Sequence, residues 1–453
     1  MRYVLEEQKK IPVAAEKDVV VVGGGPTGLM AAIAAARSGA SVLLLEMLPF
    51  AASNMVNGPL EAIMTFHDTD RQIVGGIPQE FVDRLVRAGG SPGHIPDDVG
   101  YCKTLTPFDP EIAKLVSFEM LEESKVELLL QTKAVGCLRE NRTVKGVIIE
   151  NKSGRQAVLG KVFVDCSGDG DLCFFAGADF EKGKNGSTQP MTALFRVGGA
   201  DTGRMLDFVK HNKRRFKFGV DPEMLSEASP VHLWGFGEVL DKGFEEGFLS
   251  LKRKEIHVMT SARPGELVIN YTRAPGDGTD GSDVTRAQRT TVKQAHQLVS
   301  YFKKEVPGFE KAYIISTGVI GIRETRRIRG LYMLSESDIV QHAAFQDVVA
   351  RGAFPIDIHQ PDSDSLEYKS VVKAYDIPLR SMVPAGIDNV LMAGRCLSAS
   401  HEGIGSVRIT ATCLAMGQSA GTAAAVCALE KARPADMDVQ KLQHLLVRQG
   451  ALL

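Results

Sequence analysis

The sequence predicts an α/β protein in which a parallel sheet covered by helices is interrupted by an inserted domain of mixed α+β structure. Residues 18–46 alternate an apolar run (DVVVV), an Ala-rich stretch (LMAAIAAARSG) and a second apolar run (SVLLLE), the order of a βαβ unit. Similar buried-strand runs return at residues 161–165 (KVFVD) and 389–393 (NVLMA). Between them the pattern changes to short mixed elements, polar loops and basic clusters. We therefore expect domain segments at residues 1–173, 174–382 and 383–453.

The composition is that of an ordinary globular enzyme, with 44% hydrophobic and 24% charged residues in a chain of 453. The formal net charge of −2 leaves no bulk field to attract nucleic acid or an anionic membrane. No run reaches the ~18 apolar residues of a membrane span, and the N-terminus has no apolar core of signal-peptide length. The seven cysteines are odd in number and include no Cys-x-x-Cys pair, so we expect reduced thiols in a cytoplasmic protein without a metal site.

The remaining elements follow from local patterns. Residues 78–88 and 109–124 predict helices. Residues 134–138, 144–150 and 155–159 predict three strands joined by polar turns, which is typical of an antiparallel meander. A last helix, rich in Ala and Gly, is predicted over about residues 407–430.

A glycine fingerprint lies between the first strand and the first helix. In Gly23-x-Gly25-x-x-Gly28, the first glycine allows the tight turn, the second lets the backbone approach a pyrophosphate, and the third permits close helix–strand packing. Glu46 ends the next strand, where it can accept hydrogen bonds from a ribose. The pattern predicts a Rossmann-like dinucleotide site, but by itself it does not separate FAD from NAD.

Three further features favour FAD. The meander is followed by a strand that ends in Asp165-Cys166-Ser167-Gly168-Asp169, a late strand ends in Ala393-Gly394-Arg395, and GIGSVR (residues 403–408) opens the last helix. With IPVAAEKDVVVVGGGPTGLMAAIAAARSGASVLLLE, RQIVGGIPQEFVDRL, QPMTALFRVGG, GIRETRRIRG and FPIDIH, these stretches resemble the FAD-dependent oxidoreductase family of the glutathione-reductase-like, two-dinucleotide-binding-domain flavoproteins. The resemblance extends over residues 11–424.

The resemblance implies one FAD and a set of residues that hold it. These are Gly23, Gly25, Pro26, Thr27, Gly28, Glu46, Met47, Asn54, Val135, Ser167, Gly168, Gly394, Arg395, Gly405, Ser406 and Val407. The loop after Glu46 departs from the family in lacking a Gly-Gly pair, and Arg395 replaces an Asp that many relatives of the superfamily use. No second strand–GxGxxG–helix unit is present, so a docked NAD(P)H is not expected.

The catalytic candidates lie near the implied flavin site. His401 can exchange a proton beside the reacting C–H bond, and Arg408 can bind a substrate carboxylate or a flavin carbonyl. Tyr271 and Arg273 end an apolar strand that can line a substrate pocket. Each has a structural alternative: His401 as a brace of its loop and Arg408 as a partner in an internal ion pair.

Other charged groups receive structural interpretations. The run at residues 323–327 (RETRR) predicts ion pairs at the domain interface, and Asp357 with His359 predicts a hydrogen-bonded pair rather than metal ligands. The basic run at residues 210–218 predicts a solvated face. Cys166 and Cys173 are expected in the core.

We therefore expect an FAD enzyme that moves a hydride between a small organic substrate and flavin N5, with electrons exchanged with a diffusible acceptor or a redox partner protein. A homo-oligomer is compatible with the sequence. Two alternatives remain: a flavin-dependent lyase, isomerase or hydratase without net redox change, and a flavin-carrying electron-transfer subunit. A nicotinamide dehydrogenase without flavin is disfavoured by the meander and the C-terminal pattern.

Overall fold

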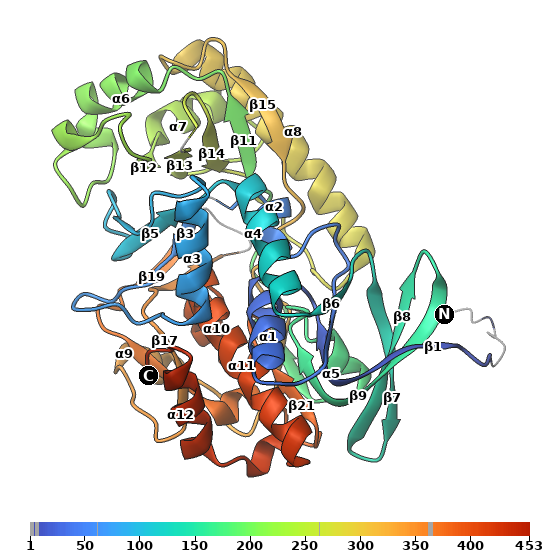
Figure 1. Ribbon diagram of the computed structural model, residues 1–453. Helices are drawn as coiled ribbons and strands as arrows, with labels where there is room; N and C mark the ends of the chain where they lie inside the picture. Colours follow the sequence, from blue (N-terminus) through green and yellow to red (C-terminus); the bar gives the residue numbers. More distant parts are fainter. Residues whose placement is uncertain (1–3, 5–8, 61, 262, 361–365) are drawn as a thin grey trace.

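The computed structural model describes residues 4, 9–60, 62–261, 263–360 and 366–453 (Figure 1). Residues 1–3 and 5–8 of the N-terminal segment, in which no signal-peptide core is expected, lie outside the described residues. The main sheet confirms the predicted α/β class. Its parallel strands run in the order β6 (Glu127–Leu129), β2 (Val42–Leu45), β1 (Val13–Val22), β9 (Gly154–Asp165), β21 (Val390–Met392). A strand from the C-terminal part thus completes a sheet that begins at the N-terminus.

The antiparallel meander is also confirmed. It consists of β7 (Lys133–Glu140), β8 (Thr143–Asn151) and the first half of β9. The separate strands predicted at residues 155–159 and 161–165 are one strand, because β9 leaves the meander and continues straight into the parallel sheet beside β1. Figure 1 shows the meander at one side of the molecule, away from the second sheet.

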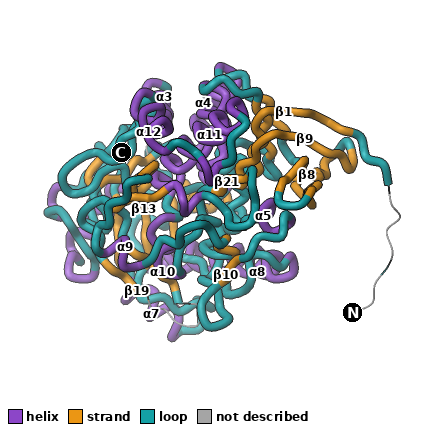
Figure 2. Tube along the Cα trace, turned by 90° about the horizontal axis from the view of Figure 1, so that it is seen from below, coloured by secondary structure: helices purple, strands orange, loops and turns teal. Residues whose placement is uncertain are grey.

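Helices cover the parallel sheet. They are α1 (Pro26–Arg37), α3 (Ile77–Arg87), α4 (Pro110–Glu123), α11 (Thr410–Glu430) and α12 (Val439–Arg448), and Figure 2 shows α3, α4, α11 and α12 gathered at one side. Helices α1 and α11 approach closely because Gly417 and Gly421 have no side chains: a Cβ there would lie 2.2 Å from Thr27 O and 2.0 Å from Ala31 O. In the described residues α11 alone is long and apolar enough to cross a membrane, but 83% of its most apolar window is buried inside the protein.

The predicted last helix is in fact two helices. α10 (His401–Val407) ends before Arg408, the backbone is extended at Ile409, and α11 begins at Thr410. The chain therefore presents a second helix N-terminus three residues beyond the GIGSV segment.

A second sheet has its own hydrophobic core. It runs β12 (His232–Gly235), β13 (Ile256–Thr260), β14 (Leu267–Asn270), β11 (Phe195–Gly198), β15 (Tyr313–Thr317), and it packs with α6 (Thr202–His211), α7 (Gly237–Glu245) and α8 (Gly281–Glu305). Buried side chains between residues 195 and 312 form this core, whereas those from 334 to 383 pack in the first core. The domain limits at 174 and 382 stay a prediction.

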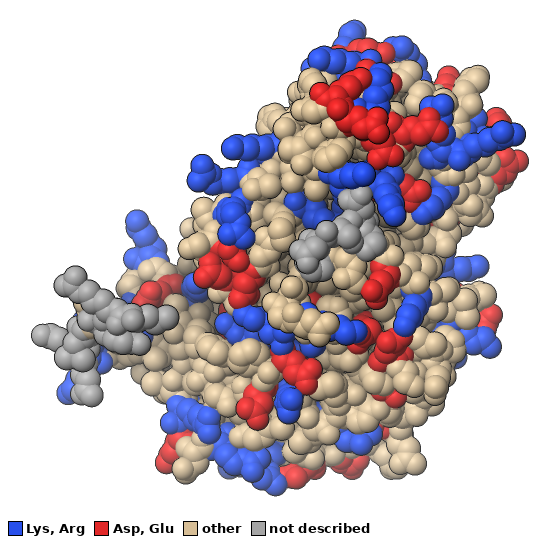
Figure 3. Space-filling model, turned by 180° about the vertical axis from the view of Figure 1, so that it is seen from behind, with Lys and Arg blue, Asp and Glu red and all other residues tan. Residues whose placement is uncertain are grey.

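The remaining elements are short. They are α2 (Asn54–Asn57), β3 (Ala62–Met64), β4 (Ile95–Pro96), β5 (Thr104–Pro107), α5 (Asp171–Phe175), β10 (Phe180–Lys182), β16 (Arg326–Ile328), α9 (Glu336–Val340), β17 (Val348–Gly352), β18 (Ile356–His359), β19 (Leu366–Lys369) and β20 (Tyr375–Pro378), with 3₁₀ turns at Lys213–Arg215, Pro222–Met224, Leu379–Met382 and Pro434–Asp436. Figure 3 shows basic and acidic side chains intermixed over one face, in keeping with the small net charge.

Candidate active site

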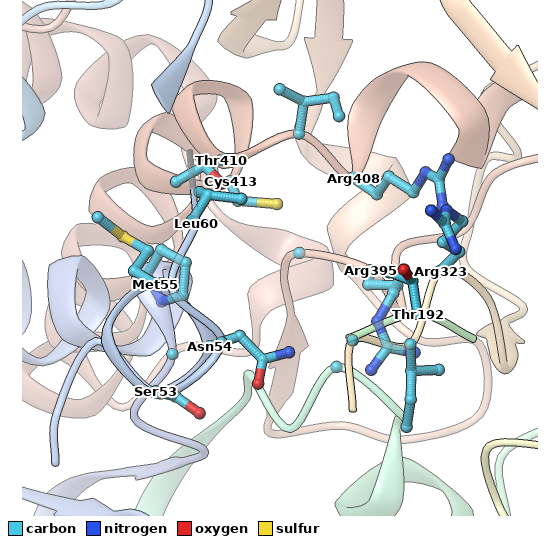
Figure 4. Close-up of a pocket in the computed structure, with 18 of the residues that line it drawn as sticks. Ser53, Asn54, Met55, Leu60, Thr192, Arg323, Arg395, Arg408, Thr410 and Cys413 are labelled. Atoms are coloured by element: carbon cyan, nitrogen blue, oxygen red, sulfur yellow. The ribbon is translucent and has the colours of Figure 1, made fainter. Parts of the chain in front are cut away.

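One cavity of about 750 Å³ runs from the fingerprint turn to the second sheet. Its lining includes Gly25 at the mouth of α1, Ser167 after β9, Gly394 after β21 and, at its far end, Trp234 and Arg273 from the second sheet. Figure 4 shows Arg323, Arg395 and Arg408 gathered on one side of the cavity, opposite the loop that carries Asn54 and Met55. The carboxyl ends of the parallel strands and the second sheet thus border one space.

The three fingerprint glycines have a geometry compatible with the roles predicted for them. Gly23 has φ +96°, and a Cβ on Gly28 would lie 1.7 Å from Gly23 O, so both are required by the turn and by packing. A Cβ on Gly25 would meet only Ser53 Cβ, at 3.8 Å. Gly25 therefore presents bare backbone to open space at a helix N-terminus, which is how a pyrophosphate is cradled.

Glu46 lies at the end of β2 with its carboxylate buried. Gly24 N donates to Oε2 and Leu48 N donates to Oε1, each at 2.7 Å. Burial raises the pKa of this carboxyl in spite of these hydrogen bonds. The two backbone donors hold the side chain at the edge of the cavity, where a ribose can be bound.

Two further segments close the cavity. Arg395 Nη1 forms an ion pair with Asp169 Oδ1 at 2.8 Å, which joins the turns after β21 and β9. The N-terminus of α11 has no side-chain cap, and Thr410 and Cys413 line the cavity (Figure 4). Its first backbone N–H groups and its positive dipole end are therefore suited to a negatively charged edge of a ligand.

A family model described as "FAD dependent oxidoreductase" matches residues 18–446, nearly the whole chain. The chain belongs to this family. It is an FAD-dependent oxidoreductase, and its cofactor is FAD. When bound, FAD supplies the redox chemistry, since its ring accepts and returns a hydride or electrons. The bare backbone at Gly25, the buried Glu46 and the uncapped α11 fit that cofactor.

Solved structures resemble this flavoprotein loosely. A geranylgeranyl bacteriochlorophyll reductase-like protein from Thermoplasma acidophilum is 14% identical to this chain, with a TM-score of 0.49. The match covers 96% of this chain and 84% of the Thermoplasma chain. p-Nitrophenol 4-monooxygenase PnpA from Pseudomonas putida is 13% identical with a TM-score of 0.43, covering 96% and 80%. No curated protein matches the sequence.

Most residues predicted to bind FAD line the cavity: Gly23, Gly25, Pro26, Thr27, Glu46, Met47, Asn54, Ser167, Gly168, Gly394 and Arg395. Val135 does not line it, and Gly28 serves the packing described above. Gly405, Ser406 and Val407 do not line the cavity. The helix N-terminus at the cavity is that of α11, which begins at Thr410, and not the predicted one at residues 403–408. A Cβ on Gly405 would meet Ile358 Cδ1 at 2.7 Å, and Ser406 bonds to Phe354 O and Tyr375. The residues that line the cavity here are Arg408, Ile409 and Thr410 instead.

The four catalytic candidates divide into two pairs. Arg273 and Arg408 line the cavity. Tyr271 is fully buried and donates to Leu251 O at 3.0 Å, which leaves it a structural residue. His401 Nδ1 lies 2.9 Å from Glu324 Oε1, outside the cavity lining, so its structural alternative is the one the geometry supports.

The predicted ion pairs of residues 323–327 are present in part. Arg326 pairs with Asp171 at 2.9 Å, and Arg327 pairs with the buried Glu324. Arg323 differs, because it donates to Pro190 O at 2.7 Å and lines the cavity. The basic run at residues 210–218 is mostly solvated, as predicted, although Lys217 borders the cavity over the Trp234 ring.

Sequence reasoning missed a chain of buried hydrogen bonds that ends at the cavity. His232 Nδ1 lies 2.7 Å from Asp97 Oδ1, and His232 Nε2 lies 2.9 Å from His257 Nδ1. The two imidazole planes are within 20° of each other, and His257 lines the cavity. The sequence shows a histidine on each of two neighbouring strands, and this could have suggested the pair. Whether the two side chains meet depends on the register of β12 and β13, which the sequence does not show.

His359 and Asp357 are paired, as predicted, and also line the cavity. His359 Nε2 lies 3.2 Å from Asp357 Oδ1, and Arg273 Nη2 lies 3.0 Å from His359 Nδ1. Burial, with the charge of Arg323 next, lowers the pKa of His359 to about 3, so this imidazole is neutral near pH 7. Among the described residues, no cluster of three or more His, Cys, Asp or Glu side chains is arranged to hold a metal ion.

Proposed function

We propose that this flavoprotein moves a hydride between a small organic substrate and N5 of the flavin, in the part of the cavity that lies against the second sheet. The observation that carries the proposal is the continuity of the cavity. The same space is lined by the fingerprint turn at one end and by Trp234, His257 and Arg273 of the second sheet at the other. A cofactor held at the fingerprint turn therefore shares one chamber with whatever the second sheet binds.

The second sheet acts as the substrate domain in this proposal. Strands β12, β13 and β14 bring their side chains to the roof of the cavity, so substrate selectivity resides on them. The meander and the N-terminus of α11 support membership of the glutathione-reductase-like superfamily. We further propose a cytoplasmic enzyme that exchanges electrons with a diffusible acceptor or a redox partner protein.

His257 handles the proton that accompanies hydride transfer. The pKa of Asp97 is lowered by its bond to His232 although burial opposes this, so the carboxylate is ionised and His232 Nδ1–H donates to it. When His232 is neutral, its Nε2 accepts from His257 Nδ1–H, and the lone pair of His257 lies on Nε2. Burial lowers the pKa of His257 well below its usual value, so this imidazole is neutral at neutral pH and holds a proton only while the hydride moves.

Anaerobic mixing of the FAD-loaded protein with a metabolite panel tests the proposal. We expect one class of substrate to bleach the flavin absorbance in a single turnover. Turnover without an acceptor and without net bleaching would instead support a lyase, isomerase or hydratase. FAD that is photoreduced but is bleached by no substrate would support an electron-transfer subunit.

A further inference from the structure

Five arginines from distant parts of the chain line the cavity. Arg395 pairs with Asp169, and the other four are Arg253, Arg273, Arg323 and Arg408. Arg253 and Arg273 are less than 9% exposed, and the Arg408 side chain is 7% exposed. Figure 4 shows Arg323 and Arg408 side by side. Burying several like charges together is costly unless an opposite charge lies among them.

The acidic side chains that line the cavity do not balance this cluster. Asp357 contacts it, with Oδ2 3.6 Å from Arg408 Nη2. Asp169 is bound to Arg395, and Glu255 is bound to Lys217. Asp357 is therefore the lining carboxylate that contacts the cluster, and Glu324, outside the lining, also acts on Arg408.

The donors of Arg408 are incompletely used, and Arg323 lies beside it (Figure 4). Arg408 Nη2 donates to Asp357 O at 3.0 Å, while the buried Nε of Arg408 has no hydrogen-bond partner. Burial lowers the pKa of Arg323 well below its ordinary value, and the charge of Arg408 lowers it further. An anion beside both groups would accept the unused donors and offset the repulsion between them.

Aromatic side chains line the same cavity. The ring of Tyr101 lies edge-on to Trp234, with centroids 5.4 Å apart, and to Phe354, with centroids 5.5 Å apart. All three residues line the cavity, as does Tyr368. Aromatic walls of this kind favour a flat, apolar ligand body.

We propose that the substrate is an organic carboxylate with a flat, unsaturated or aromatic body, whose carboxylate binds between Arg323 and Arg408. The inference rests on the proposed function only in calling the ligand a substrate. The binding site itself is independent of any redox step. A guanidinium pair fits a carboxylate because its planar N–H groups match the two oxygens.

Calorimetric titration of the FAD-loaded protein tests the site. The probes are benzoate, cinnamate and fumarate, each compared with its amide at equal ionic strength. We expect at least one carboxylate to bind at least about tenfold more tightly than its amide, because charged hydrogen bonds to arginine are lost in the amide. Absence of binding by all three carboxylates, or equal affinities for acid and amide, would contradict the proposal.

Variants locate the anion. Arg323→Gln should weaken binding of the carboxylate about ten- to a hundredfold while amide binding changes little. Arg323→Lys should restore part of the affinity. The matched control is Arg204→Gln, which removes the same charge from an exposed side chain of α6 that pairs with Glu310. Equal effects of Arg323→Gln and Arg204→Gln would show that only bulk charge matters, which would overturn the assigned site.

The same titrations separate this inference from the proposed function. Tight carboxylate binding without flavin bleaching by any substrate would contradict hydride transfer and leave the anion site standing. Bleaching by a neutral substrate, with no preference for carboxylates, would contradict the anion site alone.

Discussion

At the scale of single residues, the proposed proton path ends at His257, which is hydrogen-bonded through His232 to Asp97. His257→Gln should slow substrate-driven flavin reduction about a hundredfold with FAD still bound, because a positioned base contributes rate factors of this order. Asp97→Asn should also slow reduction, since an amide can donate to His232 Nδ1 and so reverse the order of donors. Stopped-flow bleaching measures both.

The control for these variants is His296→Gln, an exposed histidine on α8. It should reduce at the wild-type rate. If His257→Gln also reduces at that rate, the proton is handled elsewhere.

The buried neutral His359 makes a prediction about pH and stability. Its pKa is about 3 in the folded chain and 6.5 as an ordinary value, so the unfolded chain takes up this proton first as the pH falls. Stability is therefore lost as the pH falls below 6.5, by up to about 1.4 kcal/mol per pH unit from this residue. Urea unfolding at pH 7.5 and 5.5 should show a smaller loss for His359→Gln than for the wild type. An unchanged difference would mean that His359 does not titrate in this way.

At the scale of elements, two glycines of the fingerprint differ in role: Gly25 faces the space for the ligand, and Gly28 packs against backbone. Gly25→Val should leave the chain folded but abolish FAD loading, because its side chain would occupy the open cradle. Gly28→Ala should instead lower the free energy of unfolding by at least about 3 kcal/mol, since the backbone of Gly23 fills that space.

The FAD content of Gly25→Val is measured after acid precipitation releases the cofactor. The unfolding of Gly28→Ala is followed by circular dichroism. Gly281→Val is the matched control, because a Cβ at this first residue of α8 meets no atom within 4 Å. Normal FAD content in Gly25→Val would contradict the cradle.

Elements with a local signal could be predicted from the sequence, and those without one could not. The βαβ unit, the meander and α3 and α4 follow from periodicity, turn residues and caps. The break between α10 and α11 could not be predicted, because residues 407–410 (VRIT) contain neither Gly nor Pro and only Ile409 departs from helical geometry. Because this break was not predicted, Gly405 was expected at the cavity, whereas Thr410 at the start of α11 lines it.

At the scale of the whole molecule, the candidate site is assembled from two cores. The cofactor end was predictable because its glycines lie within six residues of one another. The arginine cluster was not predictable as a set. Arg253 precedes β13 and Arg273 follows β14. Arg323 precedes β16, and Arg408 joins α10 to α11. Only the packing of the two cores brings these segments to one chamber.

This arrangement predicts that selectivity can be exchanged without loss of cofactor. Replacing residues 267–273, which include β14, with the matching segment of a relative should change substrate preference while FAD content stays constant. Unchanged preference across several such exchanges would contradict a substrate role for the second sheet. Flavin content by absorbance and initial rates with two substrates measure the outcome.

The central claim is that one cavity holds both FAD and an anionic substrate. The electron density of crystals of the FAD-loaded protein soaked with benzoate tests it most directly. We expect the pyrophosphate against Gly25 and the benzoate carboxylate within hydrogen-bond distance of Arg323 and Arg408. Density for FAD away from Gly25, or for benzoate only outside the chamber between the two cores, would contradict the account.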